Sequence, residues 1–128
     1  MPAPQVHRAT VVEDTPFYVL SMVKVKDSSH NLIGVQQSDI STITRRVSVA
    51  GVEVLASTAI TISTSVLNTV STGNIFVGTA GFNFIDLVPA TAVPDGNKTY
   101  RVEYIFTLTS GVAFPLLVDA ATIEVVRS

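Results

Sequence analysis

Two histidines, His7 and His30, are the residues of this chain best suited to acid–base or nucleophilic chemistry. His30 follows Asp27, Ser28 and Ser29, so an acid, two hydroxyls and a base lie together in the sequence. Neighbours this close in a Ser- and Asp-rich segment normally cap the backbone of a turn and face water. The Gly-x-Ser-x-Gly pattern of a nucleophile elbow does not occur in the chain. We therefore expect a turn here and no catalytic residue.

Acidic residues are scattered along the chain rather than clustered. Only Glu13 and Asp14 are adjacent, so metal ligands would have to come from converging loops, an arrangement that calcium accepts. Glu103 and Glu124 lie on segments with a strand pattern, and a pair of such carboxylates is what glycoside hydrolysis requires. Solvent-facing positions on the strands explain both residues more simply. We expect no metal, no cofactor and no enzymatic activity.

Glycines and aromatic residues give two further candidate sites. The segment 78–81, Gly-Thr-Ala-Gly, has no lysine and no helix start after it, so a turn or bulge is expected instead of a phosphate site. Tyr100 and Tyr104 alternate with polar residues and share a face with valine, phenylalanine and leucine, which favours the core over a stacking platform. An exposed trio of Phe76, Phe82 and Phe84 would instead indicate a carbohydrate-binding or adhesion module.

Composition excludes several classes of function. Of the 128 residues, 47% are hydrophobic and only 14% charged, and the net charge is -2. Since the few basic residues are scattered, the chain has no positive field to hold nucleic acid. The absence of cysteine removes disulfides and zinc–thiolate sites, so packing or assembly must stabilise the fold.

No segment predicts a membrane or secretion role. Residues 1–5 lack the basic and then apolar design of a secretion signal, and no apolar run is long enough to span a bilayer. Serine and threonine interrupt the charge-free stretch 54–85 throughout. We expect a protein that is made in the cytoplasm and does not contact membrane.

Alternation of apolar and polar residues predicts strands along most of the chain. The clearest segment is Tyr100–Leu108, followed by a hairpin turn with Gly111. Residues 66–70 leave one short helix open. The pattern predicts an all-β fold, a single antiparallel β-sandwich of immunoglobulin-like type, with a small β-barrel as the alternative. The expected strands are 17–26, 40–49, 52–63, segments within 76–88, 99–108, 112–118 and 122–127.

The first sixteen residues differ from the rest, because Pro2, Pro4 and Pro16 oppose regular structure and no apolar period is visible. We expect residues 1–16 to form an extended N-terminal arm outside a sandwich domain of residues 17–128. The arm contains Val6, Val11 and Val12, whose apolar side chains favour docking onto a neighbouring subunit. A homo-oligomer is one expected assembly.

Two strand-forming segments of the C-terminal third are Asn83–Pro89 and Thr99–Tyr104, the second followed by Phe106 and Thr107. These segments resemble small β-sandwich virion proteins of tailed bacteriophages. The resemblance implies a non-enzymatic structural protein of the virion, made in the host cytoplasm. Its implied role is a capsid cement or decoration protein that contacts the major capsid protein or other virion proteins. A neck or tail component is the alternative within this family.

Overall fold

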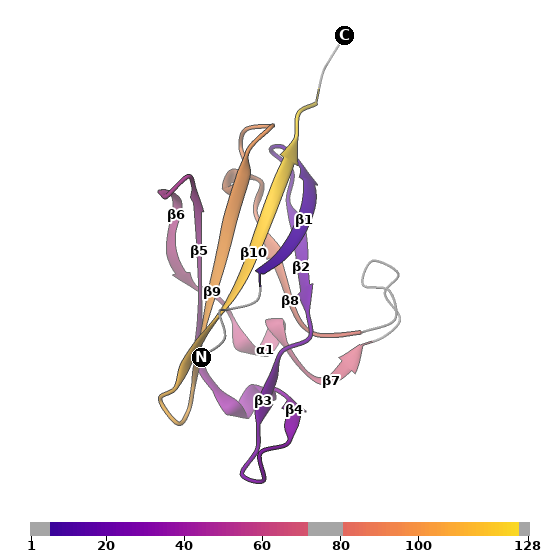
Figure 1. Cartoon of the computed structure of the whole chain (residues 1–128), viewed down its shortest axis with the longest axis vertical. Helices are drawn as coiled ribbons and strands as arrows, with labels where there is room; N and C mark the ends of the chain where they lie inside the picture. The colour runs from indigo at the N-terminus through magenta and orange to yellow at the C-terminus, as the bar shows by residue number, and fades with distance from the viewer. Residues whose placement is uncertain (1–5, 72–80, 126–128) are drawn as a thin grey trace.

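The computed structural model describes residues 6–71 and 81–125 and shows two β-sheets packed face to face (Figure 1). A five-stranded sheet has the order β1-β10-β9-β5-β6, and a three-stranded sheet has the order β2-β8-β7. The strands of the larger sheet are β1 (Val6–Val12), β10 (Ala113–Ile123), β9 (Thr99–Leu108), β5 (Ile40–Val49) and β6 (Val52–Ala59). The smaller sheet consists of β2 (Phe17–Ser21), β8 (Phe82–Val88) and β7 (Val66–Ser71).

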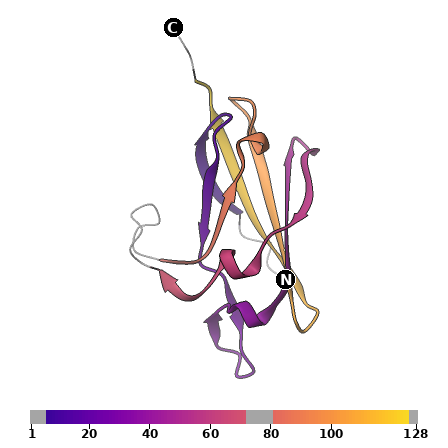
Figure 2. The ribbon, with the colours of Figure 1, turned by 180° about the vertical axis from the view of Figure 1, so that it is seen from behind.

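The strand order confirms the predicted immunoglobulin-like sandwich. In that fold the later strands of the chain join an early strand in one sheet, and the remaining strands form the second sheet. Figure 2 shows the smaller sheet from behind, separate from the larger one. In the described part of the chain the sheets do not close on each other, so the alternative, a small β-barrel, is not formed.

The core lies between the sheets and is centred on β9. Tyr100, Val102, Tyr104 and Phe106 are all buried, as their alternation predicts. Phe84 on β8 meets the rings of Tyr104 and Phe106 edge-on, each at a centroid distance of 5.1 Å. These aromatic pairs join the two sheets and contribute beyond the area they bury.

Tyr100 also fixes the corner that leads into β9. Its hydroxyl accepts a hydrogen bond of 3.1 Å from the backbone N–H of Asp95, five residues earlier in the chain. A tyrosine at the start of this strand, bonded back to the preceding backbone, is the tyrosine corner of immunoglobulin-like sandwiches. The corner follows a short 3-10 helix, η3 (Ala90–Ala92), and the predicted turn at 94–97.

Residues 6–12 are part of the sandwich, which corrects the expectation of an arm over residues 1–16. They form β1, which pairs in parallel with β10 from Val6 opposite Leu117 to Val12 opposite Ile123. Val11 enters the core with 9% of its surface exposed. A parallel partner more than a hundred residues away leaves no local signal in the sequence. Residues 1–5 lie outside the described residues.

Strand boundaries differ from the prediction in several places, and the expected strand 52–63 ends at Ala59. The segment 17–26 is divided into β2 and β3 (Lys24–Lys26), and β3 forms a hairpin with β4 (Leu32–Gly34) around the predicted turn at 27–31. The expected strands 112–118 and 122–127 are instead one strand, β10, as far as Ile123. Pro115 lies opposite Ile105 of β9, and the pairing of β10 with β1 among the described residues begins two residues later, at Leu117.

The short helix left open at residues 66–70 is not formed there, because these residues belong to the strand β7. The connection from β6 to β7 instead contains a helix, α1 (Ile62–Ser65), which begins at the end of the expected strand 52–63. A 3-10 helix, η1 (Gln37–Asp39), precedes β5. The residues Phe76 and Gly78 to Ala80 of the predicted segments lie outside the described part of the chain. None of the helices described is long and apolar enough to cross a membrane.

Candidate interaction surface

The turn around His30 serves the local backbone. Asp27 Oδ1 accepts hydrogen bonds of 2.9 Å from the N–H groups of Ser29 and Asn31. His30 is exposed at the tip, with a positive φ of 65°. The acid is therefore engaged with the backbone, as the sequence predicts for a capped turn.

The other candidate acids do not come together. Glu103 lies in the middle of β9 opposite Leu117, whereas Glu124 follows the end of β10 and accepts a hydrogen bond of 2.8 Å from Asn97. Leu117 and Ile123 are six residues apart on β10, a length of roughly 20 Å at the rise of a β-strand. Glu103 and Glu124 are therefore far apart. Within the described ranges 6–71 and 81–125, no three His, Asp or Glu side chains are grouped so as to hold a metal ion.

The aromatic residues considered for carbohydrate binding are core residues where the structure describes them. Phe82 is 5% exposed and Phe84 is fully buried, which contradicts an exposed trio. Phe76 lies outside the described residues. The stacking alternative is also contradicted for Tyr100 and Tyr104, which are buried in the core.

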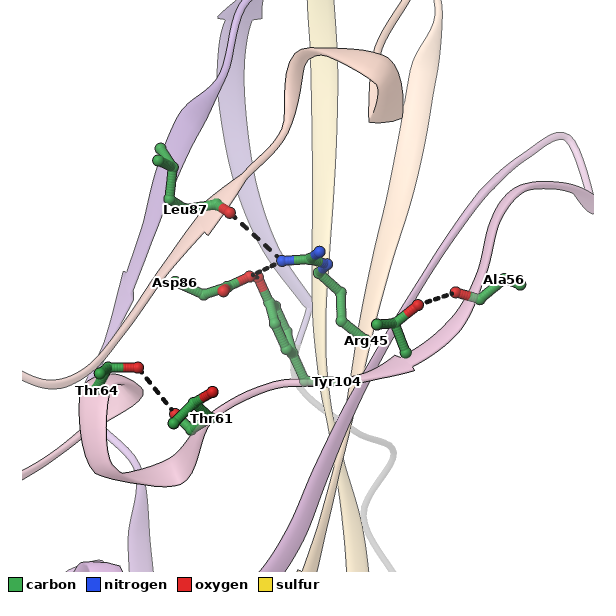
Figure 3. Close-up of polar contacts among 8 residues, drawn as sticks. Arg45, Ala56, Thr61, Thr64, Asp86, Leu87 and Tyr104 are labelled. Carbon is green, nitrogen blue, oxygen red and sulfur yellow. Dashed lines mark hydrogen bonds and ion pairs between the residues drawn. The ribbon is translucent and has the colours of Figure 1, made fainter.

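A buried ion pair crosses from one sheet to the other, and the sequence gives no hint of it (Figure 3). Arg45 on β5 donates from Nη1 to Asp86 Oδ2 on β8 over 2.7 Å, and Tyr104 on β9 donates its hydroxyl proton to the same oxygen over 2.7 Å. Burial, together with the charge and hydrogen bond of Asp86, raises the pKa of Tyr104 far above its ordinary value. These groups satisfy each other, so we assign them a structural role.

A second internal polar contact holds the break between β2 and β3. Asn83 is 1% exposed, accepts a hydrogen bond of 2.7 Å from the N–H of Val23 and donates one of 2.8 Å to its carbonyl. The amide side chain is the partner of the Val23 N–H and shares the Val23 carbonyl with the N–H of Val35, so it takes the place of a neighbouring strand at this position.

The outward face of the three-stranded sheet carries apolar side chains. Because neighbouring strand residues alternate between faces, burial of Val19 and Asp86 places the residues beside them on the outside. Tyr18 lies opposite Leu87, and these side chains are 62% and 48% exposed. Leu20 lies opposite Ile85 in the next outward pair, and both are half-buried. We call these four residues the outer patch.

The outer patch departs from the usual pattern of a two-layer sandwich, in which outward positions are polar. The larger sheet follows that pattern at its surface, where Arg101 donates two hydrogen bonds to Asp119, of 2.9 and 3.1 Å. The hydrogen bond from Arg101 lowers the pKa of Asp119 below its ordinary value. At these positions the larger sheet therefore carries an ion pair and the smaller sheet an apolar pair.

Strands β1 and β2 lie side by side at one side of the sandwich (Figures 1 and 2). The side chains of these strands line an open groove that adjoins the outer patch. It contains one cavity of about 660 Å³ and one of about 260 Å³. The larger is lined by Ala9, Thr10, Val11, Phe17, Tyr18, Leu20 and Ile85. The smaller extends from His7 and Arg8 to Ser21 and Val118. We call this the edge groove.

The residues predicted to dock on a neighbour occupy three different environments. Val11 belongs to the core and to the edge groove, Val6 is half-buried on β1, and Val12 is 41% exposed. Val11 is therefore committed to its own chain. The sequence did not single out Tyr18, Leu20, Ile85 or Leu87, although an alternating strand with apolar residues on both faces was visible at 17–26.

Comparisons with known proteins found no relative of the chain. No protein-family model matches it, and neither a curated protein nor a solved structure was found to be similar.

Proposed function

We propose that this chain is a non-enzymatic structural protein of a tailed-bacteriophage virion, a cement or decoration subunit that binds the major capsid protein through the outer patch. The observation that carries the proposal is the exposed pair Tyr18 and Leu87, which lie opposite each other where an outward strand position is normally polar. Large apolar side chains grouped on one face mark protein-interaction surfaces.

Tyrosine is well suited to the centre of such an interface. Its ring buries a large area, loses little conformational freedom on binding, and its hydroxyl remains able to make a hydrogen bond. Leu20 and Ile85 continue the apolar surface from this pair toward the edge groove. The virion as the location, and the capsid protein as the partner, follow from the resemblance of segments 83–89 and 99–104.

The internal polar groups support a structural role. Asp86, Arg45 and Tyr104 bond to one another, and Asn83 bonds to the backbone of Val23. Groups that could have served in catalysis are thus used to hold the sandwich together. What remains at the surface of the smaller sheet is an apolar contact area.

The test compares surface variants in binding to capsids that lack the protein. Tyr18→Ser and Leu87→Ser remove the outer patch, while Val52→Ser and Val112→Ser change side chains that are 66% and 60% exposed elsewhere. We expect the first pair to weaken co-sedimentation with capsids at least ~10-fold and the control pair to leave it unchanged. Equal binding by all four variants would contradict the proposal.

A further inference from the structure

We propose that the edge groove is an acceptor site for an extended segment of a partner protein, which adds to β2 as a further strand. The inference rests on the proposed docking role of the adjoining outer patch and names the form in which the partner binds. Three independent features of the groove, as formed by the described residues, carry it: a strand edge with no neighbour, an apolar cavity and a buried hydroxyl without a partner.

The free edge belongs to β2. In the described residues this strand pairs with β8 on one side only, so backbone N–H and C=O groups on its other side point toward the groove. Proteins normally protect such edges with lysine, proline or a bulge. The sequence of β2, Phe-Tyr-Val-Leu-Ser, has no charge and no proline, and its register with β8 is regular. It is an unprotected template for strand addition.

The cavity defines the side chains of the added segment. Side chains of a strand alternate between two faces, so every second residue of the segment would point into the space beside Val11 and Phe17, on the core-facing side of β2. Because this lining is apolar, those residues should be apolar too. Among the described residues, His7 and Arg8 are the basic ones that line the smaller cavity, and no carboxylate lines it. Arg8 lies opposite Asp119 on β10, so His7 is the basic group without a paired acid in the register, which favours an acidic residue at that end of the segment.

The hydroxyl of Ser21 distinguishes the edge groove from a merely empty apolar gap. Its side chain is buried, with 7% of the residue exposed, and Oγ has no hydrogen-bond partner among the residues that the structure describes. The residue lines the smaller cavity of the groove. A buried polar group without a partner destabilises a fold, so a hydroxyl retained there indicates a partner supplied from outside. A backbone carbonyl of an added strand provides such an acceptor.

A second copy of the chain does not fit this site as well as a separate segment. Two-fold pairing would place the same surface of each copy against the other. The edge groove is concave, so groove against groove would leave both cavities unfilled. An extended segment fills the groove with its side chains and satisfies the β2 edge with its backbone.

The experiment uses a synthetic peptide, acetylated and amidated, of sequence Glu-Thr-Val-Thr-Val-Thr-Val. Binding to the full-length chain is followed by nuclear magnetic resonance on the β2 amides. A peptide with proline at the central valine tests the backbone pairing, and one with lysine in place of glutamate tests the charge preference. We expect the proline peptide to bind at least ~10-fold more weakly and the lysine peptide to bind several-fold more weakly.

The variant Ser21→Ala distinguishes a serine that binds the added segment from one with a purely structural role. We expect this variant to raise the melting temperature of the free chain and to weaken the alternating peptide several-fold. Tyr18→Lys should also weaken the peptide, by placing a charge beside the β2 edge, whereas Val52→Lys on the edge strand β6 should not.

Four results would overturn the inference. They are equal binding of the alternating and proline peptides, a lower melting temperature for Ser21→Ala, dimerisation through the β2 amides without peptide, and new peptide binding on removal of residues 1–5. The last two would assign the groove to a second copy or to the chain's own N-terminus. Because these readouts use no capsid, their failure is distinguishable from failure of capsid binding by the outer patch.

Discussion

Tyr104 on β9 donates its hydroxyl proton to Asp86 on β8 across 2.7 Å, and this bond joins the two sheets inside the sandwich. The same carboxylate oxygen receives the guanidinium of Arg45, whose side chain is 14% exposed. A carboxylate this deeply placed is stable only with both donors, because desolvation opposes its charge. The three residues therefore act as one unit in stability.

Removing one member of this unit should destabilise the fold strongly. We expect Asp86→Ala to lower the free energy of unfolding by about 3–5 kcal/mol, because Arg45 is left without its counter-ion. Tyr104→Phe should cost about 1.5–3 kcal/mol, the usual contribution of a hydrogen bond to a charged group. The double variant Arg45→Met with Asp86→Leu should recover most of the loss. Urea unfolding measures all three, and an additive double variant would contradict the unit.

Tyr104 should also make the fold sensitive to alkali. Its pKa in the folded chain is raised above the ordinary value of 10.0, chiefly by burial. A raised folded-state pKa gives stability that is fully present below the unfolded pKa and is lost as pH rises beyond it. We expect the free energy of unfolding to fall above about pH 10, and to fall less steeply in Tyr104→Phe. Parallel pH profiles for the two proteins would show that another group is responsible.

Asn83 should be nearly irreplaceable at its position. Asn83→Ala leaves the N–H of Val23 without its partner, at a cost of about 1–3 kcal/mol for a buried group, while the Val23 carbonyl keeps its hydrogen bond from the N–H of Val35. Asn83→Asp keeps the acceptor but loses the donor, so it should retain part of the stability. The exposed Asn31 in the hairpin turn serves as a control, and Asn31→Ala should change thermal stability little. Equal losses for Asn83→Ala and Asn31→Ala would rule out the bridging role.

The first strand should contribute to folding rather than act as a free arm. Val11 is 9% exposed and Val12 is 41% exposed, although they are neighbours on β1. We expect Val11→Ala to lower the free energy of unfolding by about 1–3 kcal/mol and Val12→Ala to lower it by less than about 0.5 kcal/mol. Chemical denaturation of the two variants measures the difference. Similarly small losses of stability in both variants would indicate that residues 6–12 are an arm outside the core.

The alternation of apolar and polar residues was sufficient to predict the strands that pair with close or regular partners. β5 and β9 have the predicted bounds because each alternates over ten residues and buries one face. β1 was missed because flanking prolines obscure a strand whose partner, β10, is at the other end of the chain. The sequence contains no signal for the roles of Asp86 and Asn83, since their partners lie far away along the chain. The outer patch needed the assignment of faces, which only the pairing of β2 with β8 provides.

The accessibility of Tyr18 in the assembled particle tests the central claim most directly. Hydroxyl-radical labelling of free chain and purified virions, read by mass spectrometry, compares Tyr18 and Leu87 with Val52 and Val112, all of them exposed in the free chain. The proposed docking predicts that labelling of Tyr18 and Leu87 falls at least several-fold in the virion, while that of Val52 and Val112 is unchanged. Undiminished labelling of Tyr18 in the virion, with protection of Val52 or Val112 instead, would contradict it.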